Sequence, residues 1–157
     1  MALDPDFVAD CPYGPEAVPI DEIVEVDREQ GIIRAVMSTH PDLPLTRDQR
    51  APPVRHPRHV SVGFMVHLTG MLGFMHTYYI LGLRHADGWI GYGGRIYDAR
   101  FAALAKMGPP LHLELRATKI RQRASQVFAR YEFRFTQDDS LVYSGDQAAM
   151  WMKVSVS

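Results

Sequence analysis

The sequence has little cysteine, little net charge and no internal repetition, and each of these absences narrows the possible functions. Cys11 is the only cysteine among 157 residues, so no intramolecular disulfide can form and nothing indicates secretion. The formal net charge is −1, which gives no strong overall attraction to nucleic acid. No sequence pattern repeats with a period of about 20 to 50 residues, which disfavours a solenoid of stacked repeats. We predict a single domain over residues 1–157.

Motifs of metal, nucleophile and nucleotide chemistry are also missing. No His-x-x-x-His pair places two ligands on one face of a helix, so we predict no metal site. No Gly-x-Ser-x-Gly elbow occurs, and Cys11 lies in a proline-flanked leader without a nearby base. The glycines of residues 91–94 lack the strand–turn–helix context of a dinucleotide site. We expect no cofactor.

The first residues lack the features of a targeting segment. Residues 1–6 are acidic and short of apolar side chains, unlike the start of a signal peptide. We expect a cytoplasmic protein without nucleic-acid or membrane partners. Four prolines and a glycine exclude a long helix from residues 1–19, which we predict to be a loop or a short helix.

Charge is absent from residues 60–83, which contain no Asp, Glu, Lys or Arg. We predict one long helix here, apolar on nearly every side, and such a helix is either buried all round or crosses a membrane. The polar residues His67, Thr69, His76 and Thr77, and the alternating sequence that follows, favour a buried helix. We expect His76 to have a structural role.

The remaining sequence alternates between apolar and polar residues, as β-strands do. Its long alternating stretches predict an antiparallel sheet with one buried face and one solvated face. Two of the strands are joined by a glycine-containing hairpin loop. The predicted strands cover residues 20–27, 33–37, 89–97, 111–120, 127–136 and 141–156. Three glycines in residues 89–97 indicate bulges or the close approach of another backbone or a ligand. A turn-rich crossing is predicted over residues 99–107.

A proline-rich connection of residues 40–59 precedes the helix and is long enough to be functional or disordered. It contains four arginines within twelve residues. These arginines have two interpretations, which the sequence does not separate. They bind an anionic group such as a phosphate, or they pair with nearby acids in a solubilising loop.

This order of elements resembles the hot-dog fold, an α+β fold in which a curved antiparallel β-sheet is wrapped around one long central helix. The resemblance covers most of the chain from Cys11 onward and is closest to the 3-hydroxyacyl-ACP dehydratases. The matching stretches are Val62-Gly63, residues 97–101 followed by Met107-Gly108-Pro109, and the last hairpin through Gly145. It implies an enzyme of acyl thioesters carried by coenzyme A or acyl carrier protein, and a homodimer or larger assembly.

The dehydratases have a histidine in the loop before the helix, a Pro-Gly pair that opens the helix, and an acid one turn later. In this chain the helix is expected to open with Val62-Gly63, which keeps the glycine and loses the proline, and the chain departs from the pattern again at the acid and at the loop histidine. Counted from Gly63, the family's helix acid falls at Leu68, which cannot transfer a proton. At the family's spacing before Gly63, the loop histidine would fall at Val54. His56 and His59 can correspond to this histidine only if the alignment with the family contains a small gap. Because the dehydratase pair is absent, we favour thioester hydrolysis over dehydration.

A fainter resemblance links the chain to long-chain fatty acyl-CoA thioesterases of mycobacterial type, which also have a histidine just before the helix. Two asparagines typical of that group correspond to Ser61 and Gly70 here. A third possibility is a module that binds an acyl group or another ligand without turnover. The binding module is the favoured interpretation if no carboxylate from elsewhere in the chain occupies the space near Leu68.

Two residues at the helix start are candidates for catalysis. Backbone N–H groups at a helix N-terminus polarise a carbonyl, so Gly63 either supplies an oxyanion site or is a packing glycine. His67 lies one turn later on the same face, and it is either a general base or a core histidine bonded to a carbonyl. The candidate catalytic residues are His56, His59, Gly63 and His67. The candidate substrate-binding residues are Arg55, Arg58, Ser61, Tyr92, Arg95 and Tyr97.

Overall fold

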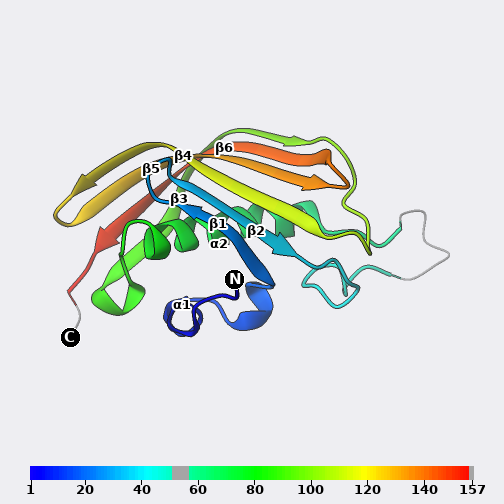
Figure 1. The fold of residues 1–157 in the computed structure, drawn as a ribbon, viewed down its shortest axis with the longest axis horizontal. Coiled ribbons are helices and arrows are strands. Elements are labelled where there is room, and N and C mark those ends of the chain that lie inside the picture. Colours follow the sequence, from blue (N-terminus) through cyan, green and yellow to red (C-terminus); the bar gives the residue numbers. More distant parts are fainter. Residues whose placement is uncertain (51–56, 156–157) are drawn as a thin grey trace.

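The structure, a computed structural model, describes residues 1–50 and 57–155. In this part of the chain, a six-stranded antiparallel sheet curves over one long helix (Figure 1). The helices are α1 (Pro5–Asp10), η1 (Pro15–Ala17), α2 (Val62–Tyr79) and η2 (His85–Asp87). The strands are β1 (Glu22–Asp27), β2 (Ile32–Met37), β3 (Trp89–Phe101), β4 (Leu111–Arg123), β5 (Gln126–Gln137) and β6 (Ser140–Lys153). Their order in the sheet is β1-β2-β4-β5-β6-β3.

The predicted hairpin and long strands are confirmed. β1 pairs with β2, and β4, β5 and β6 form a meander in which each strand pairs with the next. Burial alternates along β5, where every second side chain from Val127 to Phe135 is buried against the helix side. This alternation is the pattern from which the strands were predicted, and it gives the sheet one apolar inner face.

The strand after the helix is longer than predicted. β3 continues through residues 99–101, where a turn-rich crossing was expected, because Phe101 still pairs with Tyr143 of β6. The pairing shifts register twice, between Gly93 and Arg95 and between Ile96 and Asp98, so the glycine-rich part does contain irregularities. β3 is an edge strand of the sheet in the described residues, and most of its side chains are exposed.

The central helix is shorter than the uncharged stretch that predicted it. Ser61 caps its start, since the Ser61 hydroxyl oxygen accepts a hydrogen bond of 3.2 Å from the Gly63 N–H. The helix ends at Tyr79, and Gly82 then adopts a left-handed φ of 68° that turns the chain. The expected opening of the helix at Val62-Gly63 is confirmed. At its other end the helix stops before the uncharged stretch does, because apolar composition alone does not mark the C-terminal cap.

The expectation that this helix is buried all round was wrong for one of its faces. Leu68, Leu72 and Met75 are completely buried in the core under the sheet. Gly63 and Gly70, by contrast, are exposed. Within the described residues, the structure contains no helix with the length and hydropathy needed to cross a membrane. An exposed stripe on α2 thus faces a cavity, which is the candidate site.

Candidate active site

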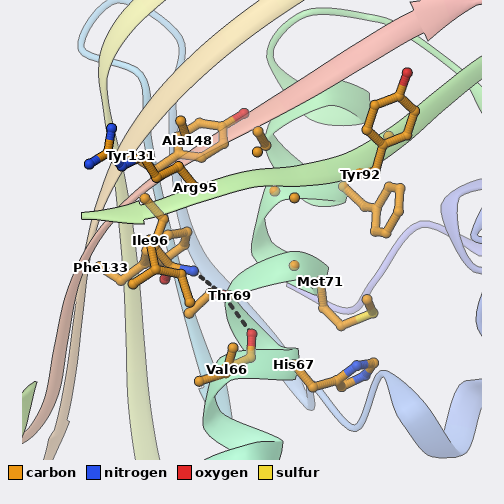
Figure 2. Close-up of a pocket in the computed structure, with 18 of the residues that line it drawn as sticks. Val66, His67, Thr69, Met71, Tyr92, Arg95, Ile96, Tyr131, Phe133 and Ala148 are labelled. Atoms are coloured by element: carbon orange, nitrogen blue, oxygen red, sulfur yellow. Dashed lines mark hydrogen bonds between the residues drawn. The ribbon is translucent and has the colours of Figure 1, made fainter. Parts of the chain in front are cut away.

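A cavity of about 610 Å³ lies between α2 and the inner face of β3, β5 and β6 (Figure 2). Its walls are largely apolar and aromatic, with a few polar groups. The lining residues are Tyr13, Gly63, Val66, His67, Thr69, Gly70, Met71, Gly73, Phe74, Gly91, Tyr92, Gly93, Gly94, Arg95, Ile96, Tyr131, Phe133, Gln147, Ala148, Ala149 and Trp151. A concave apolar site with few convergent polar groups is the usual form of a small-molecule site.

The floor of the cavity is a stripe of α2 built from residues three and four positions apart. Gly63, Val66, Gly70 and Phe74 have this spacing and therefore lie on one face of the helix. A Cβ atom placed on Gly70 would meet no other atom within 4 Å, so the absence of a side chain keeps the middle of the floor open. In Figure 2, Val66 and Thr69 lie on one side of the helix, with His67 and Met71 on the other.

His67 is held by three contacts on its flank of the cavity. Its Nε2 atom lies 2.7 Å from the carbonyl oxygen of Ala17, in the turn η1. Its ring stacks on Phe64 at 5.4 Å and meets the edge of Tyr13 at 5.0 Å. Because a carbonyl only accepts, the neutral ring carries its hydrogen on Nε2 and leaves Nδ1 as a hydrogen-bond acceptor. The bond to a backbone carbonyl is the one expected of a core histidine, and the same ring also lines the cavity; the general-base role stays a prediction.

A chain of side-chain hydrogen bonds occupies the opposite flank. The Tyr143 hydroxyl donates to Gln147 Oε1 at 3.0 Å, and Gln147 Nε2 donates to Thr69 Oγ1 at 3.3 Å, the dashed line in Figure 2. The Thr69 hydroxyl donates in turn to the Val66 carbonyl oxygen at 2.5 Å. Sequence reasoning missed Gln147, because a glutamine in an alternating strand has no signal that separates it from a solvent-facing side chain.

The inner end of the cavity is an aromatic wall formed by Tyr131, Phe133 and Trp151. Tyr131 and Trp151 pack edge to face at 6.1 Å, and the Tyr131 hydroxyl lies 3.0 Å from His76 Nδ1. Burial lowers the pKa of His76 to about 4, so the imidazole is neutral and serves as a structural partner of Tyr131. Burial also raises the pKa of Tyr131, which keeps its phenol protonated.

A glycine of β3 makes room for this wall. A Cβ atom on Gly91 would lie 2.3 Å from Nε1 of Trp151, its pairing partner in β6. The glycines of this strand predicted bulges or the close approach of another backbone or a ligand, whereas the group that approaches Gly91 is a side chain, the Trp151 indole. Within the part of the chain that the structure describes, the indole N–H has no hydrogen-bond partner.

Three of the predicted site residues besides His67 line the cavity: Gly63, Tyr92 and Arg95. Tyr92 and Arg95 come from the edge strand β3 and are exposed. The N–H of Gly63 already donates to the Ser61 hydroxyl, so a substrate carbonyl would compete with this cap for the same hydrogen. Ser61 itself caps the helix and is not among the lining residues.

The other predicted residues do not line the cavity. His59 is fixed in its loop, with Nδ1 2.9 Å from the Pro57 carbonyl oxygen. Arg58 reaches the Thr46 carbonyl at 3.5 Å, and Tyr97 packs under the Arg130 guanidinium at 4.0 Å from its ring centre. The predictions for Arg55 and His56 fall outside the described residues.

Carboxylates are missing from the described lining of the cavity, which contains no Asp or Glu. Leu68, at the position of the dehydratase acid, is completely buried in the core and points away from the cavity floor. Among residues 1–50 and 57–155, no three His, Cys, Asp or Glu side chains gather as metal ligands. The polar side chains of the described lining are therefore uncharged apart from Arg95 and the titratable His67; besides these two they are Thr69, Gln147, Tyr13, Tyr92, Tyr131 and Trp151.

No protein-family model matches the sequence, and no curated protein matches it. Solved structures do match. A mutant thioesterase from Pseudomonas aeruginosa has a TM-score of 0.63 at 15% identity, covering 98% of this chain and 97% of its own. A dehydratase heterocomplex from Xenorhabdus doucetiae has a TM-score of 0.63 at 12% identity, over 94% and 91% of the two chains. A mutant thioesterase from Staphylococcus aureus has a TM-score of 0.56 at 14% identity, over 83% and 92%.

These identities are low, and similarity at this level establishes a fold and leaves function open. The shared architecture is an antiparallel sheet curved around one long helix, and it extends over nearly the whole chain. The α+β class predicted from the sequence is confirmed. The chain has the hot-dog fold.

Proposed function

We propose that this protein acts on an acyl thioester bound in the cavity between α2 and β3, and that the reaction is hydrolysis. The observation that carries the proposal is a large apolar cavity whose floor is flanked by His67, and the Nδ1 atom of His67 has no hydrogen-bond partner among the described residues. The acyl group lies against the aromatic wall, and the thioester carbonyl lies above Gly70, where the floor is open. Two of the structures that share the fold are thioesterases, which is consistent with this proposal.

The proposed mechanism uses His67 as the general base. Its Nε2–H bond to Ala17 fixes the ring and the tautomer, so that Nδ1 can accept a proton from a water molecule. The water oxygen attacks the thioester carbonyl and forms a tetrahedral intermediate. When the C–S bond breaks, the protonated His67 returns the proton to the thiolate, which leaves a carboxylic acid, a free thiol and a neutral imidazole.

The carrier of the thioester is proposed to approach from the β3 side. Arg95 is the guanidinium group among the described lining residues, and it lies on the exposed edge strand. A phosphate of coenzyme A or of the acyl carrier protein arm would find a charge partner there. The exposed edge also supports a proposed homodimer, because β3 is thirteen residues long and, among the described residues, pairs with a strand on one side only, which leaves its outer edge as a template for a second copy.

The lack of a carboxylate in the described lining favours a second candidate, a module that binds the acyl thioester without turnover. A histidine without a carboxylate partner is a modest base, and Leu68 supplies no acid. The two candidates differ in one measurable property, which is the release of free thiol.

The test is thiol release from a panel of short, medium, long and aromatic acyl-CoA thioesters, with hydration of an enoyl-CoA measured in parallel. If His67 is the base, His67→Ala should lower kcat for thiol release by about 100- to 10,000-fold. His112→Ala, an exposed histidine on β4, is the matched control and should leave the rate unchanged. Activity that appears only in the enoyl-CoA assay would replace hydrolysis with dehydration. A threefold or smaller effect of His67→Ala would refute the proposed base.

A variant that fills the floor tests whether the thioester binds in this cavity. Gly70→Leu would place a side chain in the middle of the cavity floor, where a Cβ atom meets nothing within 4 Å and where the thioester carbonyl is proposed to lie. This variant should therefore lose both thioester binding and thiol release. If the parent neither binds nor cleaves any member of the panel, the proposed function is wrong.

A further inference from the structure

The hydrogen-bond chain on the β6 side of the cavity has a fixed polarity. Thr69 has a single hydroxyl hydrogen, and the 2.5 Å contact assigns it to the Val66 carbonyl. Thr69 Oγ1 can therefore only accept from Gln147, so the amide nitrogen of Gln147 faces Thr69 and its oxygen faces Tyr143. The three bonds are mutually consistent only in this orientation of the amide.

One hydrogen of the Gln147 amide takes no part in this series of hydrogen bonds. The amide nitrogen of Gln147 carries two hydrogens, and the bond to Thr69 Oγ1 uses one of them. Among the residues that the structure describes, the second hydrogen has no acceptor, and Gln147 lines the cavity. The group is also held rigidly, because Tyr143 is completely buried and Thr69 is 4% exposed. The result is a preorganised N–H donor in an apolar cavity.

The donor and the proposed base lie on opposite sides of the open floor. Gln147 bonds to Thr69 on one flank of α2, and His67 is on the other flank (Figure 2). At 3.6 residues per turn, Gly70 lies between these two flanks on the helix surface. A planar thioester above Gly70 would direct its carbonyl oxygen to one side and expose its carbon to a water molecule on the other. The Gly63 N–H is a weaker candidate for the oxygen, since the Ser61 cap already occupies it.

We propose that Gln147 is a further catalytic residue, whose side-chain N–H donates to the thioester carbonyl oxygen and to the oxyanion that develops from it. This inference rests on the acyl-thioester function proposed above. Tyr143 is a positioning residue, because its hydroxyl fixes the Gln147 carbonyl and so holds the amide nitrogen next to Thr69 in the cavity lining. A donor aimed at a developing oxyanion in an apolar site stabilises the transition state more than the ground state.

A glycine between the two residues makes this positioning possible. A Cβ atom on Gly145 would lie 2.5 Å from the Tyr143 hydroxyl oxygen and 3.0 Å from Gln147 Oε1. Gly145→Ala should therefore displace the Tyr143–Gln147 bond without adding an atom to the cavity lining. Tyr143→Phe removes the same bond by deleting only the hydroxyl, and it keeps the buried ring.

The experiment compares the full-length parent with Gln147→Leu and Tyr143→Phe, and uses Gln122→Leu, an exposed glutamine of β4, as the matched control. Loss of one oxyanion donor lowers kcat by about 100- to 1,000-fold. We expect this loss in Gln147→Leu with KM within about threefold, and a smaller loss of kcat, again without a change in KM, in Tyr143→Phe. Gln122→Leu should match the parent in both constants.

A binding measurement tests the donor without turnover. One ligand is a hexanoyl-CoA analogue in which a methylene replaces the sulfur, which keeps the carbonyl as a ketone. The other is S-hexyl-CoA, which has no carbonyl. The parent should bind the ketone about three- to tenfold more tightly, the range of one net hydrogen bond, and Gln147→Leu should remove this preference.

The two measurements separate the failure of the donor from the failure of hydrolysis. In one outcome the parent releases no thiol but binds the ketone more tightly, and Gln147→Leu loses this preference. Gln147 is then a hydrogen-bond donor to the carbonyl, and the proposed hydrolysis is wrong. The inference is overturned if the parent shows no preference for the ketone, or if the preference survives in folded Gln147→Leu. It is also overturned if Gln147→Leu hydrolyses thioesters within threefold of the parent rate.

Discussion

The buried His76 should make this protein sensitive to mild acid. Its side chain is 1% exposed under the sheet, and burial lowers its pKa from 6.5 to about 4. An unfolded chain binds a proton at His76 below about pH 6.5, whereas the folded protein resists this proton until about pH 4. The unfolded state therefore binds more protons within this window. Stability falls as the pH drops through it and is independent of His76 above it.

The size of the effect follows from the separation of the two pKa values. A difference of about 2.5 pKa units, at about 1.4 kcal/mol per unit, gives roughly 3 kcal/mol of lost stability by pH 4. At about pH 4.5 most of this loss, about 2.5 kcal/mol, should already be present. A loss of this size is a large fraction of the stability of an ordinary domain.

The assay is urea unfolding of the parent and of His76→Gln at about pH 7.5 and pH 4.5. His76→Gln keeps an acceptor for the Tyr131 hydroxyl but does not titrate in this range. The variant will be less stable at neutral pH, so the quantity to compare is each protein's own change between the two pH values. The parent should lose about 2.5 kcal/mol more than the variant. Equal losses in the two proteins would show that His76 already exchanges its proton freely in the folded state, and the reasoning would fail.

Two further predictions concern the edge strand. Gly91→Ala should destabilise the fold by about 1–3 kcal/mol, since its Cβ would collide with the Trp151 indole. Gly93→Ala in the same strand meets nothing within 4 Å and should be nearly neutral in thermal unfolding, so equal effects would contradict the packing argument. Light scattering at micromolar concentration should give the mass of a dimer or larger, and a monomeric mass would contradict pairing through β3.

The architecture could be predicted because its signals are local and repeated. Alternation of apolar and polar side chains over ten or more residues identifies a strand with one buried face, and a long uncharged stretch between strands identifies the central helix. What the helix composition could not reveal was its exposed stripe. Gly63, Gly70 and Phe74 look as apolar as the core residues Leu68 and Leu72, and only the position of β3 determines which set faces the cavity.

The site was only partly predictable because its key contacts join residues far apart in sequence. His67 was identified from its place one turn into the helix, but its bond to Ala17 depends on how the N-terminal segment folds back. Gln147 meets Thr69 across 78 positions, and no spacing rule in one sequence reports such a pair. Gly91 was expected to allow a close approach, yet the identity of Trp151 as its neighbour follows from the register of β3 against β6.

The absence of a carboxylate from the described lining is compatible with catalysis once the two flanks of the floor are considered together. A buried carboxylate in an apolar cavity must be paired or it becomes protonated, because its ionised form is costly to desolvate. A neutral imidazole and an amide N–H incur a smaller cost, and both are fixed here by bonds to partners outside the reaction: Ala17 for His67, and Tyr143 with Thr69 for Gln147. The cavity can therefore hold an apolar acyl group without an ionised side chain on its floor. In the proposed mechanism, charge appears there only when the water attacks, with the imidazolium of His67 on one side of Gly70 and the oxyanion at the Gln147 N–H on the other.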